Sequence, residues 1–486
     1  MDLTPQAWRG ARVITASALA ASVGAAIAAG SPTVGVSLAL LPVIMWLATR
    51  STATWVAGAL IVAVAYRGLA GLHVAPGSGQ FVHIPLVWGA LGIALLRTRA
   101  ASTPSIARRS VVLVGLLAFA VAASTLANQL DPIRGLVYFL LLGEPFAIIC
   151  ALQFDPPDAR DRKILIRLCA ALVAIQVPLA YGQALFSGLG DPVQGTLYGS
   201  GAGAHVVAAV VIVGAVWYVS RVSAPLSIPA LALVASMIGI ILISDAKQVT
   251  FALPVMILAQ RRISTRTVLL ALMAFIAIFA VVQVRTLNQG YAVPYIDRAL
   301  SGHSGKQAVG KMIWHDATSD FGTFVLGQGP AETVSRAAFE TLPAYQNTGS
   351  AGSALRSLGL APAQTALKAN IVAAQAVGQP PGAPLDSFDS GLSSAIGVFG
   401  DLGFIGAVAY LGLFGTVFFA VRRATTPESA AAASGLAMLF VLGFILDWWE
   451  EPAFTVFLAT LTGLALTSTR EGSALSRKLD PSWFPA

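Results

Sequence analysis

Residues 392–421 read LSSAIGVFGDLGFIGAVAYLGLFGTVFFAV, and Arg422 and Arg423 follow directly. Asp401 is the only charged residue within this run. A helix of about 20 apolar residues is long enough to cross the hydrocarbon core of a bilayer. The run therefore predicts a transmembrane helix that ends at a basic pair, and similar runs along the chain indicate the fold class.

The composition of the whole chain agrees with this reading. Of its 486 residues, 56% are hydrophobic and 11% are charged, and the mean hydropathy is +0.76, whereas soluble domains carry roughly 25% charged residues. So many apolar side chains must face lipid. We therefore predict an all-α polytopic integral membrane protein and exclude an ordinary soluble enzyme and a disulfide scaffold. Cys150 and Cys169 lie in apolar segments and are predicted to be buried free thiols.

Apolar runs bounded by charge, glycine or proline predict about 12 to 14 spans. The candidates are 13–29, 33–49, 52–66, 82–96, 111–127, 135–152, 164–185, 202–219, 226–243, 248–259, 267–284, 392–421, 430–447 and 453–468. The chain then divides into N-terminal transmembrane helices (1–284), one large extracytoplasmic loop (285–389), C-terminal transmembrane helices (390–468) and a cytoplasmic tail (469–486).

The distribution of charge predicts which side of the membrane each connection faces. With the N-terminus in the cytoplasm, 20 of the 30 Lys and Arg residues fall on cytoplasmic connections, and three fall on short outer ones. This is the bias of the positive-inside rule. The net charge of +8 is explained without nucleic acid, and both termini are predicted to be cytoplasmic.

The segment 285–389 is the longest stretch without a membrane-length apolar run, and a loop of this length is usually functional. It holds seven basic and seven acidic residues. Residues 306–326 and 330–342 are predicted as amphipathic helical pieces, and 379–384 (QPPGAP) as a rigid connector back to the membrane.

Ionisable residues at membrane depth are costly and tend to line polar cavities. The candidates are Glu144, His205, Asp245, Lys247, Asp447, Glu450 and Glu451. Asp245 and Lys247 are also explained by an interfacial ion pair, and the two adjacent glutamates by anchoring beside tryptophans. The sequence also predicts a cationic outer vestibule that would bind a diphosphate. It would consist of Lys247, Arg285, Arg298, Lys306 and Lys311. No phosphate loop or metal-spaced histidine cluster is present, so no metal or cofactor is predicted.

Short motifs recur in a distinctive order along the chain. They are DPIR (131–134), GTLYG (195–199), SDAK (244–247), GKMIW (310–314), LGQGP (326–330), DSGL (389–392) and DLGFIG (401–406). This order, with the single large outer loop, resembles the O-antigen ligase and polysaccharide polymerase superfamily over roughly residues 130–421.

The resemblance implies a GT-C-like helical fold and a metal-independent glycosyltransferase. Such an enzyme transfers a glycan from an undecaprenyl diphosphate carrier at the outer face of the bacterial inner membrane. The diphosphate would be bound by Lys247, Lys311, Arg285, Arg298, Lys306 and Arg134. The chain departs from the family where Lys247 and Lys311 replace arginines and where Asp389-Ser390 replaces His-Asn.

These departures favour a repeat-unit polymerase of a surface or secreted polysaccharide over a ligase that attaches glycan to another acceptor. A flippase or transporter of a lipid-linked oligosaccharide is the alternative from a different class. For a polymerase, the expected partners are membrane lipid, a flippase and a chain-length regulator. Asp389 is the first candidate for the catalytic base and His315 the second, although Asp389 is equally suited to cap the helix that follows.

Overall fold

The computed structural model describes residues 51–66, 82–98, 105–197, 203–221, 227–260, 304–339, 341–342, 360–380, 385 and 390–478. Within these ranges the secondary structure is helical, and they contain no strand. The predicted spans 13–29, 33–49 and 267–284 lie outside the described residues, as do Arg285, Arg298 and Asp389.

Two groups of helices make up the described chain. The bundle contains α3 (Thr52–Ile61) with the π-helical turn η1 (Val62–Tyr66), α5 (His83–Arg97), α6 (Ser105–Ala127), α7 (Pro132–Phe154), α8 (Ala159–Ser187), the 3-10 turn η4 (Gly195–Leu197), α9 (Gly203–Arg221), α10 (Ile228–Ile243), α11 (Lys247–Leu258), α19 (Ser394–Arg423), α20 (Pro427–Ile445), the 3-10 turn η6 (Trp448–Glu450) and α21 (Pro452–Lys478). The loop contributes α14 (Gly305–Thr318), α15 (Phe321–Leu326), α16 (Arg336–Phe339) and α18 (Gln364–Ala376).

Six helices are long and apolar enough to cross a membrane, namely α6, α7, α8, α9, α19 and α20. Each predicted apolar run from 52–66 to 248–259 and from 392–421 onward coincides with a described helix, so the all-helical class is confirmed. Length and composition of these helices mark a membrane protein.

The loop differs in detail from its predicted helical pieces. Residues 306–326 form two helices because the Asp320 side chain accepts a hydrogen bond from the backbone N–H of Thr323 (2.8 Å) and starts α15 anew. Among the described residues of 330–342, only Arg336–Phe339 is helical. Helix α18 was not among the predicted pieces.

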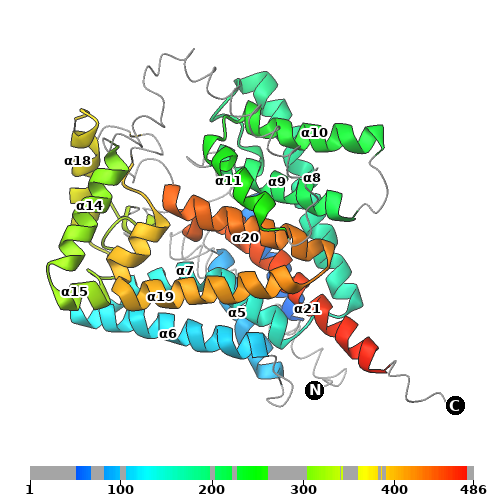
Figure 1. Cartoon of the computed structure of the whole chain (residues 1–486), viewed down its shortest axis with the longest axis horizontal. Helices are drawn as coiled ribbons and strands as arrows, with labels where there is room; N and C mark the ends of the chain where they lie inside the picture. Colours follow the sequence, from blue (N-terminus) through cyan, green and yellow to red (C-terminus); the bar gives the residue numbers. More distant parts are fainter. Residues whose placement is uncertain are drawn as a thin grey trace, which may run out of the picture.

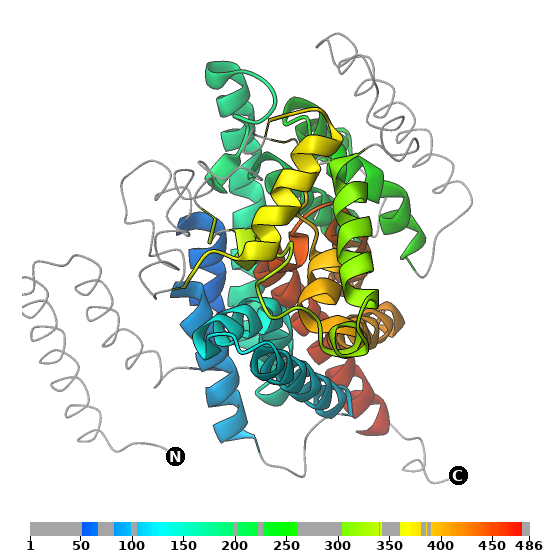
Figure 2. The ribbon, with the colours of Figure 1, turned by 90° about the vertical axis from the view of Figure 1, so that its left-hand side faces the viewer.

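The loop helices lie together at one end of the bundle. Figure 1 shows α14, α15 and α18 at the left, while α6 and α19 run side by side from there toward the right and α21 reaches the opposite end. Figure 2 looks onto the loop helices from that end. We refer to the two ends as the loop-facing end and the opposite end.

Basic side chains gather at the opposite end. Arg97 lies 3.4 Å from the Asp155 carboxylate. The Glu428 carboxylate is 2.5 Å from Arg221 and 3.6 Å from Arg162. These ion pairs join the ends of helices that are far apart in sequence.

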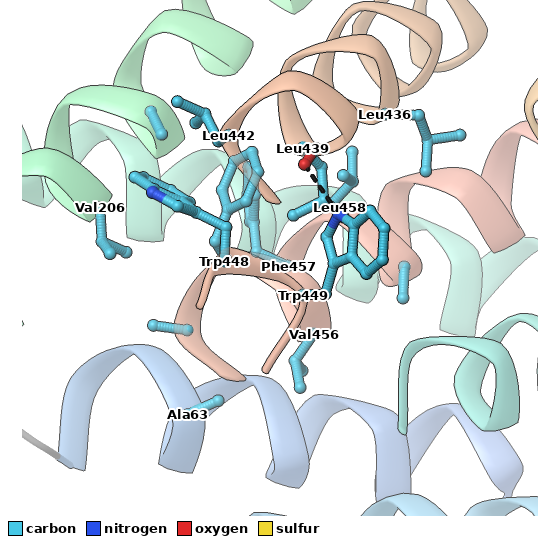
Figure 3. Packing of buried hydrophobic residues seen from close by; sticks show 14 of the residues in the cluster. Ala63, Val206, Leu436, Leu439, Leu442, Trp448, Trp449, Val456, Phe457 and Leu458 are labelled. Carbon is cyan, nitrogen blue, oxygen red and sulfur yellow. Dashed lines mark hydrogen bonds between the residues drawn. The ribbon is translucent and has the colours of Figure 1, made fainter. Parts of the chain in front are cut away.

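Packing between α20, η6 and α21 forms a central part of the core (Figure 3). Trp448 and Trp449 are each 2% exposed, so they are buried rather than placed at a lipid–water interface. The Trp449 indole N–H donates to the Leu439 carbonyl oxygen (3.0 Å), and the Trp448 N–H to Gln248 Oε1 (2.8 Å). Cys150 and Cys169 are buried free thiols, as predicted.

Candidate functional site

The loop is joined to the bundle by backbone hydrogen bonds between two of the quoted motifs. The N–H of Gln328 donates to the Gly400 carbonyl oxygen (2.7 Å), and the N–H of Gly329 donates to that of Asp401 (3.1 Å). The Asn128 side chain at the end of α6 donates to the Gly327 carbonyl oxygen (3.2 Å). Residues 326–330 therefore dock on the first turns of α19.

Glycines make this close approach possible. Gly327 has φ +79° and Gly403 has φ +63°, a conformation that L side chains rarely adopt. A Cβ atom on Gly327 would lie 2.4 Å from backbone atoms of Asp401, and one on Gly403 would lie 2.5 Å from backbone atoms of Val325 and Gly327. The two chain segments touch backbone to backbone, so neither position has room for a side chain.

The Asp401 carboxylate organises the loop residues that follow the junction. Its side chain is fully buried and accepts the backbone N–H groups of Ala331 (3.2 Å), Glu332 (3.1 Å) and Thr333 (2.7 Å). The Thr333 hydroxyl adds a fourth hydrogen bond (2.7 Å). Asp401 was not among the predicted site residues, although a lone carboxylate in a long apolar run is a visible signal.

Arg134, predicted to bind diphosphate, lies beside this turn. Its guanidinium forms an ion pair with Glu332 and donates to the carbonyl oxygens of Ala331 (3.4 Å) and Ala361. The side chain is 5% exposed. In this structure Arg134 ties the start of α7 to two separate parts of the loop.

A second arginine holds the loop to η6. Arg336 forms an ion pair with Glu451, and its Nε lies 3.9 Å from the Asp447 carboxylate. One residue later, the Ala337 N–H donates to Glu450 Oε2 (3.2 Å). The acidic residues beside the two tryptophans thus contact the loop at Arg336 and Ala337. Arg336 was not among the predicted site residues.

Glu450 is the least satisfied carboxyl group of this cluster. The residue is 2% exposed, and its Oε1 has no hydrogen-bond partner among the described residues. It belongs to a turn between α20 and α21. Burial, followed by the neighbouring Asp447 carboxylate, raises the pKa of Glu450 well above its ordinary value of 4.5. Glu450 is therefore a buried acidic group at the loop-facing end whose surroundings favour the neutral form.

This shift predicts a pH-dependent contribution to stability. A pKa raised in the folded state gives stability that is complete below the ordinary value and is lost as pH rises toward the folded-state pKa. Glutamine mimics the protonated group and retains an acceptor for the Ala337 N–H. We expect the melting temperature of Glu450→Gln, relative to wild type, to increase from pH 5 to pH 8, measured by thermal unfolding in detergent.

Asp320→Asn provides the control. Hydrogen bonds from the Thr323 backbone and side chain lower the pKa of Asp320, so this exposed group is ionised in both states over the same range. Its effect on the melting temperature should be constant from pH 5 to pH 8. A flat difference for Glu450→Gln as well would contradict the raised pKa of Glu450.

The structure brings together two other predicted site residues. Lys311 and His315 are exposed and one turn apart on α14, a spacing that places side chains on the same helix face. Lys306, in contrast, donates through Nζ to the Leu392 carbonyl oxygen before α19. Lys247 is the first residue of α11. Of the five cations predicted to form the vestibule, Arg285 and Arg298 lie outside the described residues.

Within the bundle, a buried acid–histidine pair joins α5 and α7. His83 Nε2 lies 3.3 Å from Glu144 Oε2, and the two side chains are 3% and 1% exposed. The other Glu144 oxygen has no hydrogen-bond partner among the described residues. Glu144 was predicted as an informative intramembrane residue, but its pairing with His83 was not.

No group of three or more His, Cys, Asp or Glu side chains suited to a metal ion occurs in the part of the chain that the structure describes. Neither models of known protein families nor curated protein sequences match the chain. The described residues define an all-helical protein with membrane-length apolar helices. A buried polar layer lies at its loop-facing end.

Proposed function

We propose that the chain is a membrane glycosyltransferase that polymerises oligosaccharide repeat units carried on undecaprenyl diphosphate. The reaction would take place at the outer face of the bacterial inner membrane, with both termini in the cytoplasm and a GT-C-like arrangement of 12 to 14 spans. The product would be a surface or secreted polysaccharide.

One observation carries this proposal. The motifs DPIR (131–134), LGQGP (326–330) and DLGFIG (401–406), which supported the resemblance, are distant in sequence but lie at one junction. Arg134 bonds the Ala331 carbonyl oxygen, and the Asp401 carboxylate accepts the Ala331 N–H. Motifs shared with a family for a common reason are expected to assemble in this way, whereas chance matches would be scattered.

The chemistry requires little beyond positioning and charge. A hydroxyl of the acceptor attacks the anomeric carbon of the donor, the bond from that carbon to the diphosphate oxygen breaks, and undecaprenyl diphosphate leaves. The hydroxyl proton passes to a base as the new glycosidic bond forms. Cationic side chains stabilise the charge that develops on the leaving diphosphate.

Lys311 and His315 are the described residues best placed for these two roles. They lie on one exposed face of α14 and reach the same bound group, because side chains at i and i+4 are about 5–6 Å apart at Cβ. Lys311 would contact diphosphate oxygens, and His315 would accept the proton if Asp389 serves as a helix cap. Arg134 is hydrogen-bonded to the loop, and Lys306 to the Leu392 carbonyl oxygen before α19, so we assign both to positioning.

The test uses purified protein in detergent, with a lipid-diphosphate-linked repeat unit as the only substrate. A charge-assisted contact of about 1.5–3 kcal/mol predicts that Lys311→Met lowers the rate of chain lengthening about 10-fold or more. His315→Ala should lower it further if His315 is the base. Product length is read by gel electrophoresis, and the amount of folded protein by size-exclusion chromatography.

Lys163→Met is the matched control, since Lys163 is exposed at the opposite end of the bundle, and we expect it to retain full activity. If the wild-type protein does not lengthen the glycan, the polymerase proposal is wrong. If it does, but Lys311→Met retains full activity, only the assignment of Lys311 is wrong. Transfer to a different hydroxyl acceptor without chain lengthening would indicate a ligase.

The buried pair of His83 and Glu144 favours a second function. Ionisable residues at membrane depth mark substrate or proton pathways, so a proton-coupled transporter or flippase of the lipid-linked oligosaccharide is the alternative. A detergent solution has no compartments, and a flippase cannot produce longer glycans there. The same assay therefore separates the two functions.

A further inference from the structure

Five aromatic side chains lie where the loop meets the bundle, and ring contacts join four of them, Trp314, Phe399, Phe324 and Phe404. Trp314 stacks on Phe399 with ring centroids 5.6 Å apart, and Phe324 stacks on Phe404 at 5.9 Å. Phe324 also contacts Phe399 edge to face at 6.0 Å. Phe321 begins the same short helix as Phe324. We call these five residues the aromatic patch.

The aromatic patch is exposed at the molecular surface. Phe321 is 80% exposed, Trp314 58% and Phe404 53%. Large aromatic side chains gathered in this way mark a surface that is covered by something other than water. The partner has to be identified from the surroundings.

Those surroundings are the outward faces of two membrane-length helices. Helix α15 packs against α6 and α19, and Figure 1 shows it at the loop-facing end of both. Both helices carry exposed apolar side chains, such as Leu126 (76%) and Phe119 (60%) on α6 and Val408 (47%) on α19. On helices that cross a bilayer, such side chains face lipid.

Helix length fixes the depth of the patch. A hydrocarbon core of about 30 Å corresponds to about 20 residues of α-helix. Counted from Arg422 at the opposite end of α19, this distance ends about at Leu402. Counted from Arg109 in α6, it takes in the rest of the helix to its end at Ala127. Phe404 and Leu126 therefore lie at the boundary of the apolar layer, and α15 lies against both helices at that level.

We propose that the aromatic patch binds the lipid bilayer. Helix α15 lies in the boundary between headgroups and acyl chains at the loop-facing surface and anchors the loop there. Aromatic side chains prefer this zone because their rings tolerate both polar and apolar surroundings. The exposed Lys311 and Asp320 beside the patch meet the headgroup region. The anchor does not depend on the proposed reaction.

The test measures depth with nitroxide spin labels on full-length protein in phosphatidylcholine vesicles. Cys150 and Cys169 are replaced by alanine, and single cysteines are placed at Phe321, at Leu126 as the lipid reference and at Lys368 as the water reference. Collision rates of each label with oxygen and with a water-soluble nickel complex are compared. Oxygen concentrates in lipid, whereas the nickel complex is excluded from it.

We expect the ratio of oxygen to nickel collisions at position 321 to be several-fold higher than at position 368 and close to that at position 126. All three side chains are exposed, so labelling should leave the fold intact, which a matching elution volume would verify. A ratio at position 321 equal to that at position 368 would mean exposure to water and overturn the proposal. Low collision rates with both reagents would overturn it too, because a second copy of the chain or another segment would then cover the patch.

Discussion

Gly403→Ala should abolish the docking of the loop on α19 and cause a large loss of stability. The added Cβ would lie 2.5 Å from backbone atoms of Val325 and Gly327, at a φ of +63°. A left-handed alanine costs about 1–2 kcal/mol, and overpacking adds about 1–3 kcal/mol. The overlap involves backbone atoms of both segments, so no side-chain rotation relieves it.

The measurement is thermal unfolding of the purified protein, combined with hydrogen exchange at the Gln328 and Gly329 amides, which α19 carbonyl groups protect. We expect a lower melting temperature and fast exchange at both amides. Gly415→Ala is the matched control, because Gly415 lies in the same helix with no atom within 4 Å of the added Cβ. It should be neutral or slightly stabilising, since alanine favours a helix by about 0.5–1 kcal/mol. Equal melting temperatures for the two variants would contradict the docked junction.

Asp401→Ala should also cause a large loss of stability. It removes the common acceptor of three backbone N–H groups and the Thr333 hydroxyl. Each buried donor left without a partner costs about 1–3 kcal/mol. We expect the exchange of the amides of residues 331–333 to accelerate and the melting temperature to fall strongly, even though Asp401 itself is in the bundle rather than in the loop.

Asp401→Asn separates the capping role from the need for an acidic residue. The asparagine oxygen takes the place of Oδ1 and still accepts hydrogen bonds from Glu332 and Thr333. The asparagine NH₂ group takes the place of Oδ2 and cannot accept the hydrogen bond from the Ala331 N–H. We therefore expect an intermediate loss of about 1–3 kcal/mol. The control is Asp131→Ala, since Asp131 is exposed and accepts a single hydrogen bond, from the Ile133 N–H (2.8 Å). A cap of this kind is worth about 1 kcal/mol. If Asp401→Ala costs no more than Asp131→Ala, Asp401 does not organise the loop.

The positions of the helices were readable from the sequence. A membrane-spanning segment must satisfy its backbone hydrogen bonds internally, so an apolar run of sufficient length predicts a helix without knowledge of its neighbours. The predicted runs 135–152 and 392–421, for example, correspond to α7 and α19. The buried free thiols and the α14 region were predicted for the same reason, because composition and local periodicity are sufficient.

Helix α18 and the division between α14 and α15 were not predicted. Helix α18 is only moderately apolar, and its buried face consists of small residues such as Ala366, Ala369 and Ala373. The pattern of large hydrophobic residues that predicts a helix is therefore missing, and packing stabilises the helix instead. At Asp320, capping decides where one helix ends and the next begins. Such weak local signals are outweighed by tertiary contacts.

For the candidate site, the sequence predicted individual charged residues but not the contacts between them. Arg134 and Lys311 could be selected by charge, but the sequence contains no indication that Arg134 pairs with Glu332, or that Asp401 caps a turn roughly 70 residues before it in the chain. His83 and Glu144 are likewise brought together only by the packing of α5 on α7. Hydrophobicity is a property of each segment and can be read locally. The pairing of buried charges depends on distances across the fold, and these exist only when the helices have packed.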